Sequence, residues 1–308
     1  QRVEELATRW SKELRGQNIR DIAVVISEVE SGDIIAYCGN SDMSFERDGK
    51  WVDIARSPRS SGSILKPLLY AAALQEGAIL PNSLLPDVPT DFGGFVPKNF
   101  DGTYAGAIAA DEALALSLNI PNVHLLKEYG VARFAETLQQ AGFSSLTRSA
   151  DEYGLSLVLG GAEVRLVDVV SCYSSMARCY TDSLACEGFP LNDKVALHYT
   201  FNAMREVNRP DQMDWRRASS VQNVAWKTGT SYGSRDAWAV GVTPKYVVGV
   251  WVGNADGSGV PELTGARTAG PILFDIFNLL PFSDWFTEPD ASDGVMLRVC
   301  IHSGHLAG

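Results

Sequence analysis

Strand-forming segments lie at both ends of the chain and helical segments fill the middle, and this order restricts the fold more than any other feature. Near the N-terminus, β-branched runs at 22–29 and 33–38 flank a Glu-Ser-Gly turn and predict a β-hairpin. Further strands are predicted at 221–230, 237–242 and 246–253. Because both ends supply strands, we expect them to share one antiparallel sheet in an α+β protein with a helical insertion.

Helical periodicity accounts for most of the remaining chain. Helices are predicted at 1–17, 63–77, 109–116, 121–129 (with Pro121 first), 131–141, 166–180, 195–207 and 270–279. The helix at 63–77 is apolar on nearly every side, which indicates a central, buried position. Residues 78–107, rich in Pro and Gly, predict a long irregular loop. After an acidic stretch at 281–294, a last strand is predicted at 295–301.

Composition excludes several classes of protein. Acidic residues outnumber basic ones by 37 to 26, for a formal charge of −11, whereas nucleic-acid binding needs clustered Lys and Arg. No apolar run approaches the roughly 18 residues of a membrane-spanning helix. The five cysteines include no Cys-x-x-Cys pair, and their odd number leaves at least one thiol unpaired. We therefore expect no nucleic-acid partner, no membrane span in this chain and no structural zinc site. No other metal and no cofactor is expected.

Three short motifs occur in the order Ser63-Ile-Leu-Lys66, Ser117-Leu-Asn119 and Lys227-Thr-Gly-Thr230. Given the composition, chance supplies about 0.7, about one and about 0.03 copies of them respectively. The first two are therefore weak evidence by themselves. All three together are expected about 0.02 times, which makes a shared chemical role the better interpretation.

The first motif has the residue types of an activated nucleophile. Ser63 opens the buried helix, where amide N–H groups favour developing negative charge. Lys66 lies one turn further on the same face, so its amine can reach the Ser63 oxygen. A neutral lysine needs a pKa far below the usual value of about 10.4, which burial or the charge of Lys227 can provide. Pro67 removes one helical N–H, so we expect a tightened first turn. The alternative, a capping serine beside a solvated lysine, fits poorly with a helix that has almost no polar face.

The other two motifs suit substrate recognition. Ser117 and Asn119 lie at a helix-to-helix junction, where polar side chains can also be ordinary capping residues. Lys227 lies at the end of a predicted strand, where Gly229 permits the close approach of another backbone. Hydroxyl groups beside a lysine suit a carboxylate, and such a strand can also pair with an extended peptide. A plain strand end remains the alternative.

A competing motif overlaps the third one. Residues 229–233 match the Gly-x-Ser-x-Gly nucleophile elbow around Ser231, and Asp275 with His302 or His305 follows in a suitable order. An elbow must lead from a strand into a helix, whereas residues 235–242 predict a second strand, so we disfavour it. His302 and His305 form an even weaker metal pair. Structural roles are expected for the two remaining histidines, His124 and His198.

Four segments together resemble the penicillin-recognising serine transpeptidases: 62–67, 115–121, 159–164 and 226–238. The similarity extends over about residues 20–280 and is strongest to class A bifunctional penicillin-binding proteins of the 1C type. It implies a β-lactamase-like fold, with an antiparallel sheet flanked by helices and an all-α subdomain. This agrees with the fold class expected from the order of strands and helices.

The resemblance also implies roles for the motif residues. Ser63 would be acylated by the D-Ala-D-Ala end of a peptidoglycan stem peptide, with Lys66 as its base. Ser117 would pass a proton to the leaving group, and Asn119 would orient the peptide. The amides of Ser63 and Thr230 would form the oxyanion hole. The terminal carboxylate would be held by Lys227, Thr228 and Thr230, and Gly229 and Ser231 would also belong to the substrate-binding strand end.

A DD-transpeptidase that cross-links peptidoglycan is therefore the expected function, with β-lactams as covalent inhibitors of Ser63. A DD-carboxypeptidase or β-lactamase-like hydrolase is the first alternative, and a non-catalytic receptor for β-lactams or peptides is the second. A β-lactamase would need a loop glutamate in Glu-x-x-Leu-Asn form. The nearest stretch, Glu187 to Asn192, has one residue too many.

The resemblance implies that this chain is part of a longer protein. We expect a linker helix at 1–19, a transpeptidase domain at 20–280, an acidic linker at 281–294 and the start of a C-terminal extension at 295–308. The parent would be anchored in the inner membrane of a Gram-negative bacterium, carry a glycosyltransferase domain and meet other cell-wall synthesis proteins. The domain would lie in the periplasm, where disulfides form. Cys300 would then be the cysteine without a partner in this chain, and its partner would lie in the extension.

Overall fold

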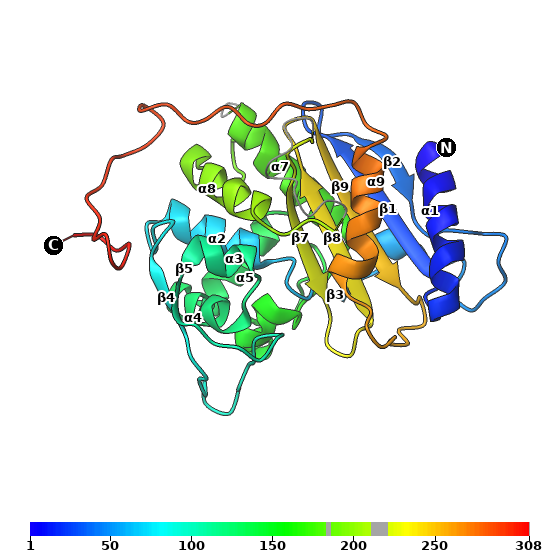
Figure 1. The fold of residues 1–308 in the computed structure, drawn as a ribbon, viewed down its shortest axis with the longest axis horizontal. Coiled ribbons are helices and arrows are strands. Elements are labelled where there is room, and N and C mark those ends of the chain that lie inside the picture. Colours follow the sequence, from blue (N-terminus) through cyan, green and yellow to red (C-terminus); the bar gives the residue numbers. More distant parts are fainter. Residues whose placement is uncertain (183–185, 211–220, 308) are drawn as a thin grey trace.

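A five-stranded antiparallel sheet forms the centre of the molecule (Figure 1). The computed structural model describes residues 1–182, 186–210 and 221–307. The strand order is β2-β1-β9-β8-β7. The strands are β1 (Asp21–Glu28), β2 (Ile34–Cys38), β7 (Ala225–Thr230), β8 (Asp236–Val242) and β9 (Tyr246–Gly253). The two ends of the chain thus share one sheet, and the predicted α+β class is confirmed.

Both faces of this sheet are covered, and β1 shows why its sequence is apolar throughout. Ile22, Val24 and Ile26 point into one hydrophobic core, whereas Ala23 and Val25 point into the other. Successive side chains of a strand alternate between faces, so a strand buried on both sides needs no polar positions. The nearly continuous apolar run at 22–26 follows from this placement.

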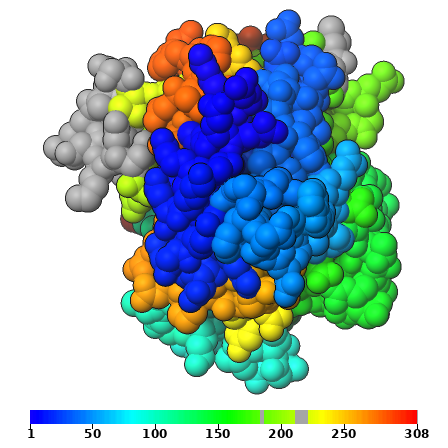
Figure 2. Space-filling model, turned by 90° about the vertical axis from the view of Figure 1, so that its right-hand side faces the viewer, coloured from blue at the N-terminus to red at the C-terminus, as the bar shows by residue number. Residues whose placement is uncertain are grey.

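One face of the sheet packs against the helices α1 (Arg2–Leu14) and α9 (Gly270–Phe277). Both appear on one side of the sheet in Figure 1, and Figure 2 shows α1 lying along this side beside the loop that follows β2. Trp10 Nε1 and Arg9 donate hydrogen bonds to Asp275 and join the two helices. A π-helical turn, Gly265–Ala269, precedes α9.

The opposite face carries the helical part of the protein. Its helices are α2 (Lys66–Gln75), α3 (Ala110–Ala115), α4 (Asn119–Tyr129), α5 (Val131–Gln140), α6 (Ala150–Tyr153), α7 (Leu166–Thr181) and α8 (Lys194–Arg205). Helix α2 is buried as predicted, because every side chain from Lys66 to Ala73 is inaccessible. Among the described residues, every helix is too short or too polar to span a bilayer.

Two short strand pairs were not expected from the sequence. Strands β4 (Leu84–Asp87) and β5 (Gly106–Ala109) pair across the segment predicted as one irregular loop, which leaves 88–105 as the loop itself. Strand β3 (Arg59–Ser60) pairs with β6 (Glu163–Val164) just before the first motif. Strands this short lack the alternating pattern that identifies longer ones.

The predicted strand at 295–301 is wrong. Residues 281–307 cross the top of the molecule in Figure 1 without a helix or strand, apart from an isolated bridge between Val299 and Leu306. Val295, Met296 and Ile301 are exposed. A strand needs a hydrogen-bonding partner along its length, and among the described residues this segment bonds only to the turn at 304–307 that follows it.

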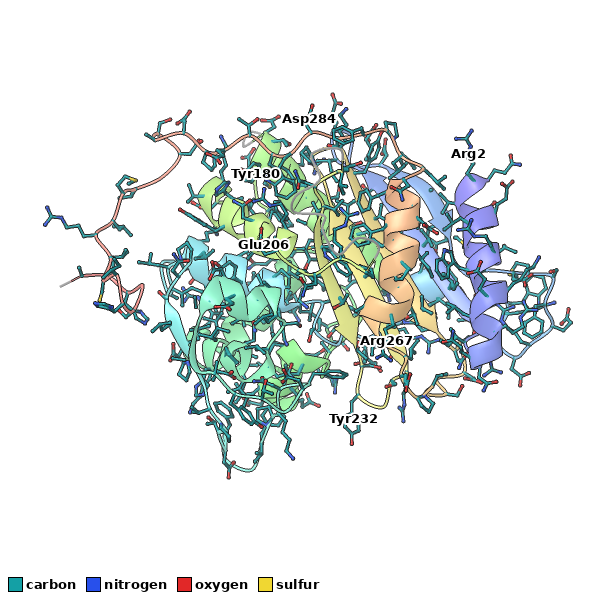
Figure 3. The ribbon with its side chains drawn as sticks, viewed as in Figure 1. Arg2, Tyr180, Glu206, Tyr232, Arg267 and Asp284 are labelled. Carbon is teal, nitrogen blue, oxygen red and sulfur yellow. A yellow bond between two sulfur atoms is a disulfide. The ribbon has the colours of Figure 1, made fainter. Side chains whose placement is uncertain are left out.

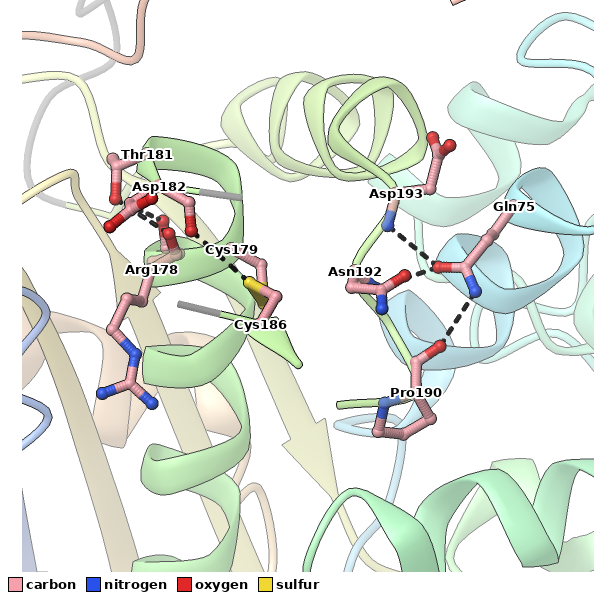
Figure 4. The surroundings of a disulfide bond; sticks show 10 residues. Gln75, Arg178, Cys179, Thr181, Asp182, Cys186, Pro190, Asn192 and Asp193 are labelled. Carbon is pink, nitrogen blue, oxygen red and sulfur yellow. Dashed lines mark hydrogen bonds between the residues drawn. A yellow bond between two sulfur atoms is a disulfide. The ribbon is translucent and has the colours of Figure 1, made fainter. Parts of the chain in front are cut away.

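One disulfide, Cys179–Cys186, links the end of α7 to the segment that leads to α8 (Figure 4). Within the described residues, Cys38, Cys172 and Cys300 are free. The expectation of at least one unpaired thiol is confirmed. Cys300 is one of three unpaired cysteines in the described part of the chain, and the other two, Cys38 and Cys172, are buried.

Candidate active site

Ser63 lies in a turn that leads into α2, so the predicted helix start at Ser63 is wrong by three residues. The reason is Pro67, whose missing N–H leaves the Ser63 carbonyl without its regular helical partner. The Lys66 N–H bonds to that carbonyl instead, at 3.3 Å and with i to i+3 spacing. The expected tightening of the first turn is confirmed. In such a turn the side chains of Ser63 and Lys66 share one side.

Buried side chains from other elements fix this turn in place. The Tyr173 hydroxyl of α7 donates to the Ile64 carbonyl at 3.0 Å. Trp238 Nε1 of β8 donates to the Ser60 carbonyl at 2.8 Å. The half-buried Ser63 is therefore held between a helix and the central sheet rather than on a free loop.

Strand β7 approaches this turn so closely that only glycine fits at two contacts. Gly62 has φ +52°, and a Cβ there would lie 2.6 Å from Thr230 N. A Cβ on Gly229 would lie 2.7 Å from the Ser61 carbonyl oxygen. The predicted role of Gly229, to admit another backbone, is confirmed. These contacts bring the first and third motifs together.

Gly62→Ala is expected to lower the free energy of unfolding by about 3 kcal/mol, because the new Cβ meets rigid backbone atoms and the residue keeps a positive φ. Gly77, at the other end of α2, is a matched control, since it has φ +68° and no atom within 4 Å of an added Cβ. Gly77→Ala is expected to cost about 1 kcal/mol. Urea denaturation of both variants measures the difference, and equal losses would contradict the proposed collision.

Lys66 is fully buried and reaches the second motif. Its Nζ donates to the carbonyls of Ser117 at 2.7 Å and Leu118 at 3.0 Å, and to Asn119 Oδ1 at 2.7 Å. Within the described residues no hydrogen bond joins Lys66 Nζ to Ser63 Oγ, although the sequence predicted that contact. The three oxygen acceptors match the three protons of an ammonium group, so the charged form is saturated without Ser63.

Lys227 joins the third motif to the second. Its Nζ donates to Ser117 Oγ at 2.7 Å and to the Thr228 carbonyl at 2.9 Å. Ser117 has a positive φ of 57°, which is costly for a residue with a side chain and is typical of functional positions. Lys66, Ser117, Asn119 and Lys227 thus form one hydrogen-bonded cluster beside the Ser63 turn.

Burial makes both lysines of the cluster easier to deprotonate than usual. Burial and then the nearby charge of Lys227 hold the pKa of Lys66 well below its usual value, as the sequence predicted. Burial lowers the pKa of Lys227 to about 7. No ion pair connects either lysine to a carboxylate among the described residues. Two buried amines without a protein counter-ion suit an anionic ligand.

The low pKa of Lys227 predicts a pH-dependent stability. Between pH 7 and about 10.4 the unfolded chain keeps a proton on Lys227 that the folded protein has lost, so stability rises with pH. Lys227→Met removes this contribution, and its free energy of unfolding is expected to rise less steeply between pH 7.5 and 9. The difference is about 1 kcal/mol per pH unit. Urea denaturation measures it, and Lys127→Met, at an exposed lysine, is the control. Parallel curves for Lys227→Met and wild type would refute the shift.

The remaining residues of the third motif lie on and beyond the edge strand. Alternation along β7 places Thr228 and Thr230 on the sheet face away from Lys227, and Thr230 Oγ1 accepts from Gly265 N at 3.1 Å. Ser231 lies in the turn to β8, where its buried Oγ accepts from Asp236 N at 2.8 Å. The hydroxyl of Ser231 is therefore occupied within the turn and does not join the lysine cluster. The next residue, Tyr232, is 98% exposed and points into solvent (Figure 3).

This turn also excludes the competing elbow motif. Ser231 is followed by strand β8 rather than by a helix. Asp275, its expected acidic partner, is bonded to α1. His124 contacts Phe92 and His198 bonds to Tyr180, so both lie in other parts of the fold. No group of three or more potential metal ligands gathers within the described residues.

Asn99 belongs to the site and was missed by the sequence analysis. Its Oδ1 accepts the N–H groups of Asn119 at 2.9 Å and Ile120 at 3.2 Å, so it caps α4 from a distant loop. Helix α4 therefore begins at Asn119, and the predicted start at Pro121 is wrong. The only hint of this capping in the sequence is Leu118. A leucine at the N-cap has no side-chain acceptor, so the first N–H groups of α4 need an acceptor from elsewhere.

Comparisons with known proteins find relatives of this chain in one family. Residues 22–156 match the family model described as the penicillin binding protein transpeptidase domain. The chain is 37% identical over 287 residues to penicillin-binding protein 1C of Escherichia coli, covering 91% of this chain and 37% of that protein. It is 28% identical to penicillin-binding protein 1A of Aquifex aeolicus, covering 90% and 41%. The chain thus spans about two fifths of these relatives.

Solved structures share the fold. A penicillin-binding protein of Mycobacterium tuberculosis, in complex with penicillin V, superposes with a TM-score of 0.76 at 21% identity, covering 94% of this chain and 88% of the other. Penicillin-binding protein 1A of Haemophilus influenzae gives 0.72 at 22% identity, covering 93% and 51%. The expected fold, an antiparallel sheet flanked by helices, is confirmed, although the helical part also contains the short β4–β5 pair.

Proposed function

Because the chain belongs to the transpeptidase family of penicillin-binding proteins, which act in peptidoglycan synthesis, we propose that it is a serine DD-transpeptidase with Ser63 as its nucleophile. The observation that carries the proposal is the cluster of Lys66, Ser117, Asn119 and Lys227 beside the Ser63 turn. Two buried lysines with lowered pKa values and no protein carboxylate fit a substrate that brings its own carboxylate.

In the proposed acylation, neutral Lys66 Nζ takes the proton from Ser63 Oγ while Oγ attacks the carbonyl of the penultimate D-Ala. The N–H groups of Ser63 and Thr230 stabilise the oxyanion. Within the described residues no acceptor is bonded to the Ser63 N–H, which leaves it available. The C–N bond then breaks, and the proton passes through Ser117 to the departing D-Ala amine. A stem-peptide amine next attacks the acyl-enzyme and releases Ser63.

The terminal carboxylate of the substrate is proposed to bind at the end of β7. Lys227 supplies the cationic donor, and Thr228 and Thr230, whose side chains lie on the other face of the sheet, are proposed to contribute through the edge strand. An edge strand also offers free backbone groups for an extended peptide. Gly229 contributes through its lack of a side chain, and Ser231 through the shape of the turn.

No observation favours the hydrolase alternatives. The stretch from Glu187 to Asn192 lies at the C-terminal end of α2, where Gln75 accepts the Asn192 N–H at 2.9 Å. Ser63 precedes the opposite end, about 15 Å away along a ten-residue helix. A glutamate there is poorly placed to activate water at Ser63, so the acyl-enzyme is expected to persist.

Mass spectrometry after brief exposure to penicillin tests the proposal. We expect a covalent adduct that maps to Ser63, survives for many minutes and is absent from Ser63→Ala. A missing adduct, or one retained by Ser63→Ala, would refute the proposal. Rapid loss of the adduct from Ser63 would support the β-lactamase-like alternative. Exchange of D-amino acids into a stem-peptide analogue separates a transpeptidase from a receptor that only acylates.

For the longer protein, we propose a periplasmic location in a Gram-negative bacterium. The Cys179–Cys186 bond supports an oxidising compartment. The share of its relatives that this chain spans supports a parent with an inner-membrane anchor and a glycosyltransferase domain. Residues 20–280 are proposed as the transpeptidase domain, and 295–308 as the start of a C-terminal extension.

A further inference from the structure

A chain of hydrogen bonds runs from a buried carboxylate in β4 to the amine of Lys66. Asp87, only 1% exposed, accepts from Asn99 Nδ2 at 2.7 Å through one oxygen and from Ala105 N at 2.8 Å through the other. Asn99, 3% exposed, accepts the N–H of Asn119. Asn119 Oδ1 in turn accepts from Lys66 Nζ at 2.7 Å. The chain connects a loop outside the three motifs to the proposed base.

The Asn99 amide has a single acceptable orientation. Its Nδ2 donates to Asp87 and to the Thr103 carbonyl, at 2.9 Å, while its Oδ1 accepts from the N–H groups of Asn119 and Ile120. Both donors and both lone pairs are thus used. A flipped amide would set its NH₂ group against two N–H donors and its oxygen against a carboxylate. Asp87 therefore determines which way Asn99 points.

All three acceptors of Lys66 Nζ belong to residues 117–119, directly before and at the start of α4. Asn99 is what holds the first N–H groups of that helix, because the N-cap residue Leu118 has no side-chain acceptor. We propose that Asn99, oriented by Asp87, is a positioning residue for acylation, one that fixes residues 117–119 and thereby the Lys66 amine. This inference rests on the proposed function.

The hydrogen bonds that Asn99 makes to α4 are expected to affect the rate constant of acylation rather than the affinity for penicillin. Lys66 must turn from its three acceptors towards Ser63 Oγ to take a proton, and that movement needs acceptors in fixed places. A misplacement of about 1 Å at such a group costs roughly 10²-fold in rate. Neither Asn99 nor Asp87 belongs to the proposed carboxylate site at the end of β7. We therefore expect the rate constant of acylation at saturating penicillin to fall while the apparent dissociation constant changes little.

Asn99→Asp tests the proposal, because it sets a second carboxylate against Asp87 and leaves the Thr103 carbonyl without its donor. Stopped-flow acylation with a fluorescent penicillin is expected to slow about 30-fold. Adding Asp87→Asn exchanges the two groups: the new amide at 87 donates to the new carboxylate at 99, which still accepts from Asn119 and Ile120. Because the Thr103 carbonyl still lacks its donor, the double variant is expected to recover most but not all of the rate constant, to within about tenfold of wild type.

Gln75 provides a control for lost stability alone. Its amide accepts the N–H groups of Asn192 and Asp193 and donates to the Pro190 carbonyl, the same kind of bridge at the far end of α2 (Figure 4). Gln75→Ala is expected to lower the melting temperature without changing the acylation rate constant. A wild-type rate in Asn99→Asp, an equal slowing in Gln75→Ala, or a folded double variant that stays slow would each overturn the inference. A wild-type protein without a Ser63 adduct would instead overturn the proposed function.

Discussion

Lys66→Met is expected to lower the rate constant of Ser63 acylation by penicillin about 10³-fold, the largest effect among the lysine variants. Methionine fills a similar volume in the buried site but cannot accept a proton. The wild-type rate constant is expected to rise with pH as the Lys66 amine loses its proton, and the residual rate of the variant to be nearly independent of pH. Stopped-flow measurements over a range of pH values test both expectations.

A matched substitution shows whether the effect of Lys66→Met comes from the loss of the base or from the loss of any lysine. Lys127 is an exposed lysine near the end of α4, so Lys127→Met is expected to leave the acylation rate constant at its wild-type value. Melting temperatures of both variants show whether the protein remains folded. A folded Lys66→Met protein that acylates within tenfold of wild type would refute Lys66 as the base.

The sequence indicated the fold well because apolar patterns report burial directly. The β-branched run at 22–29 and the run at 246–253 each identified a central strand. The all-apolar helix around Lys66 identified both the buried position of this lysine and the direction of its pKa shift. Gly229 was assigned its close contact because glycine in a strand commonly admits another backbone.

The parts that could not be predicted depend on contacts between residues distant in sequence. Asn99 lies 20 positions before the N–H of Asn119 that it caps, so no local pattern connects the two. The hydrogen bonds of Lys66 to residues 117–119 likewise exist only after folding, and they use the donors that the sequence analysis assigned to Ser63. The run at 295–301 has strand composition, but composition cannot supply a neighbouring strand, and the described residues place none beside it.

Lys227→Met is expected to lower the acylation efficiency towards penicillin about 10²-fold, because a charge-assisted hydrogen bond to the ligand carboxylate is lost. A penicillin methyl ester separates this role from the contact between Lys227 Nζ and Ser117 Oγ. If Lys227 binds the carboxylate, wild type prefers the free acid strongly, whereas Lys227→Met treats acid and ester nearly alike. If Lys227 acts mainly through Ser117, the variant slows both compounds equally and keeps the wild-type preference, which would contradict the proposed carboxylate site. Because Lys227 has no carboxylate partner within the described residues, we expect the first result, with the ligand as the missing anion.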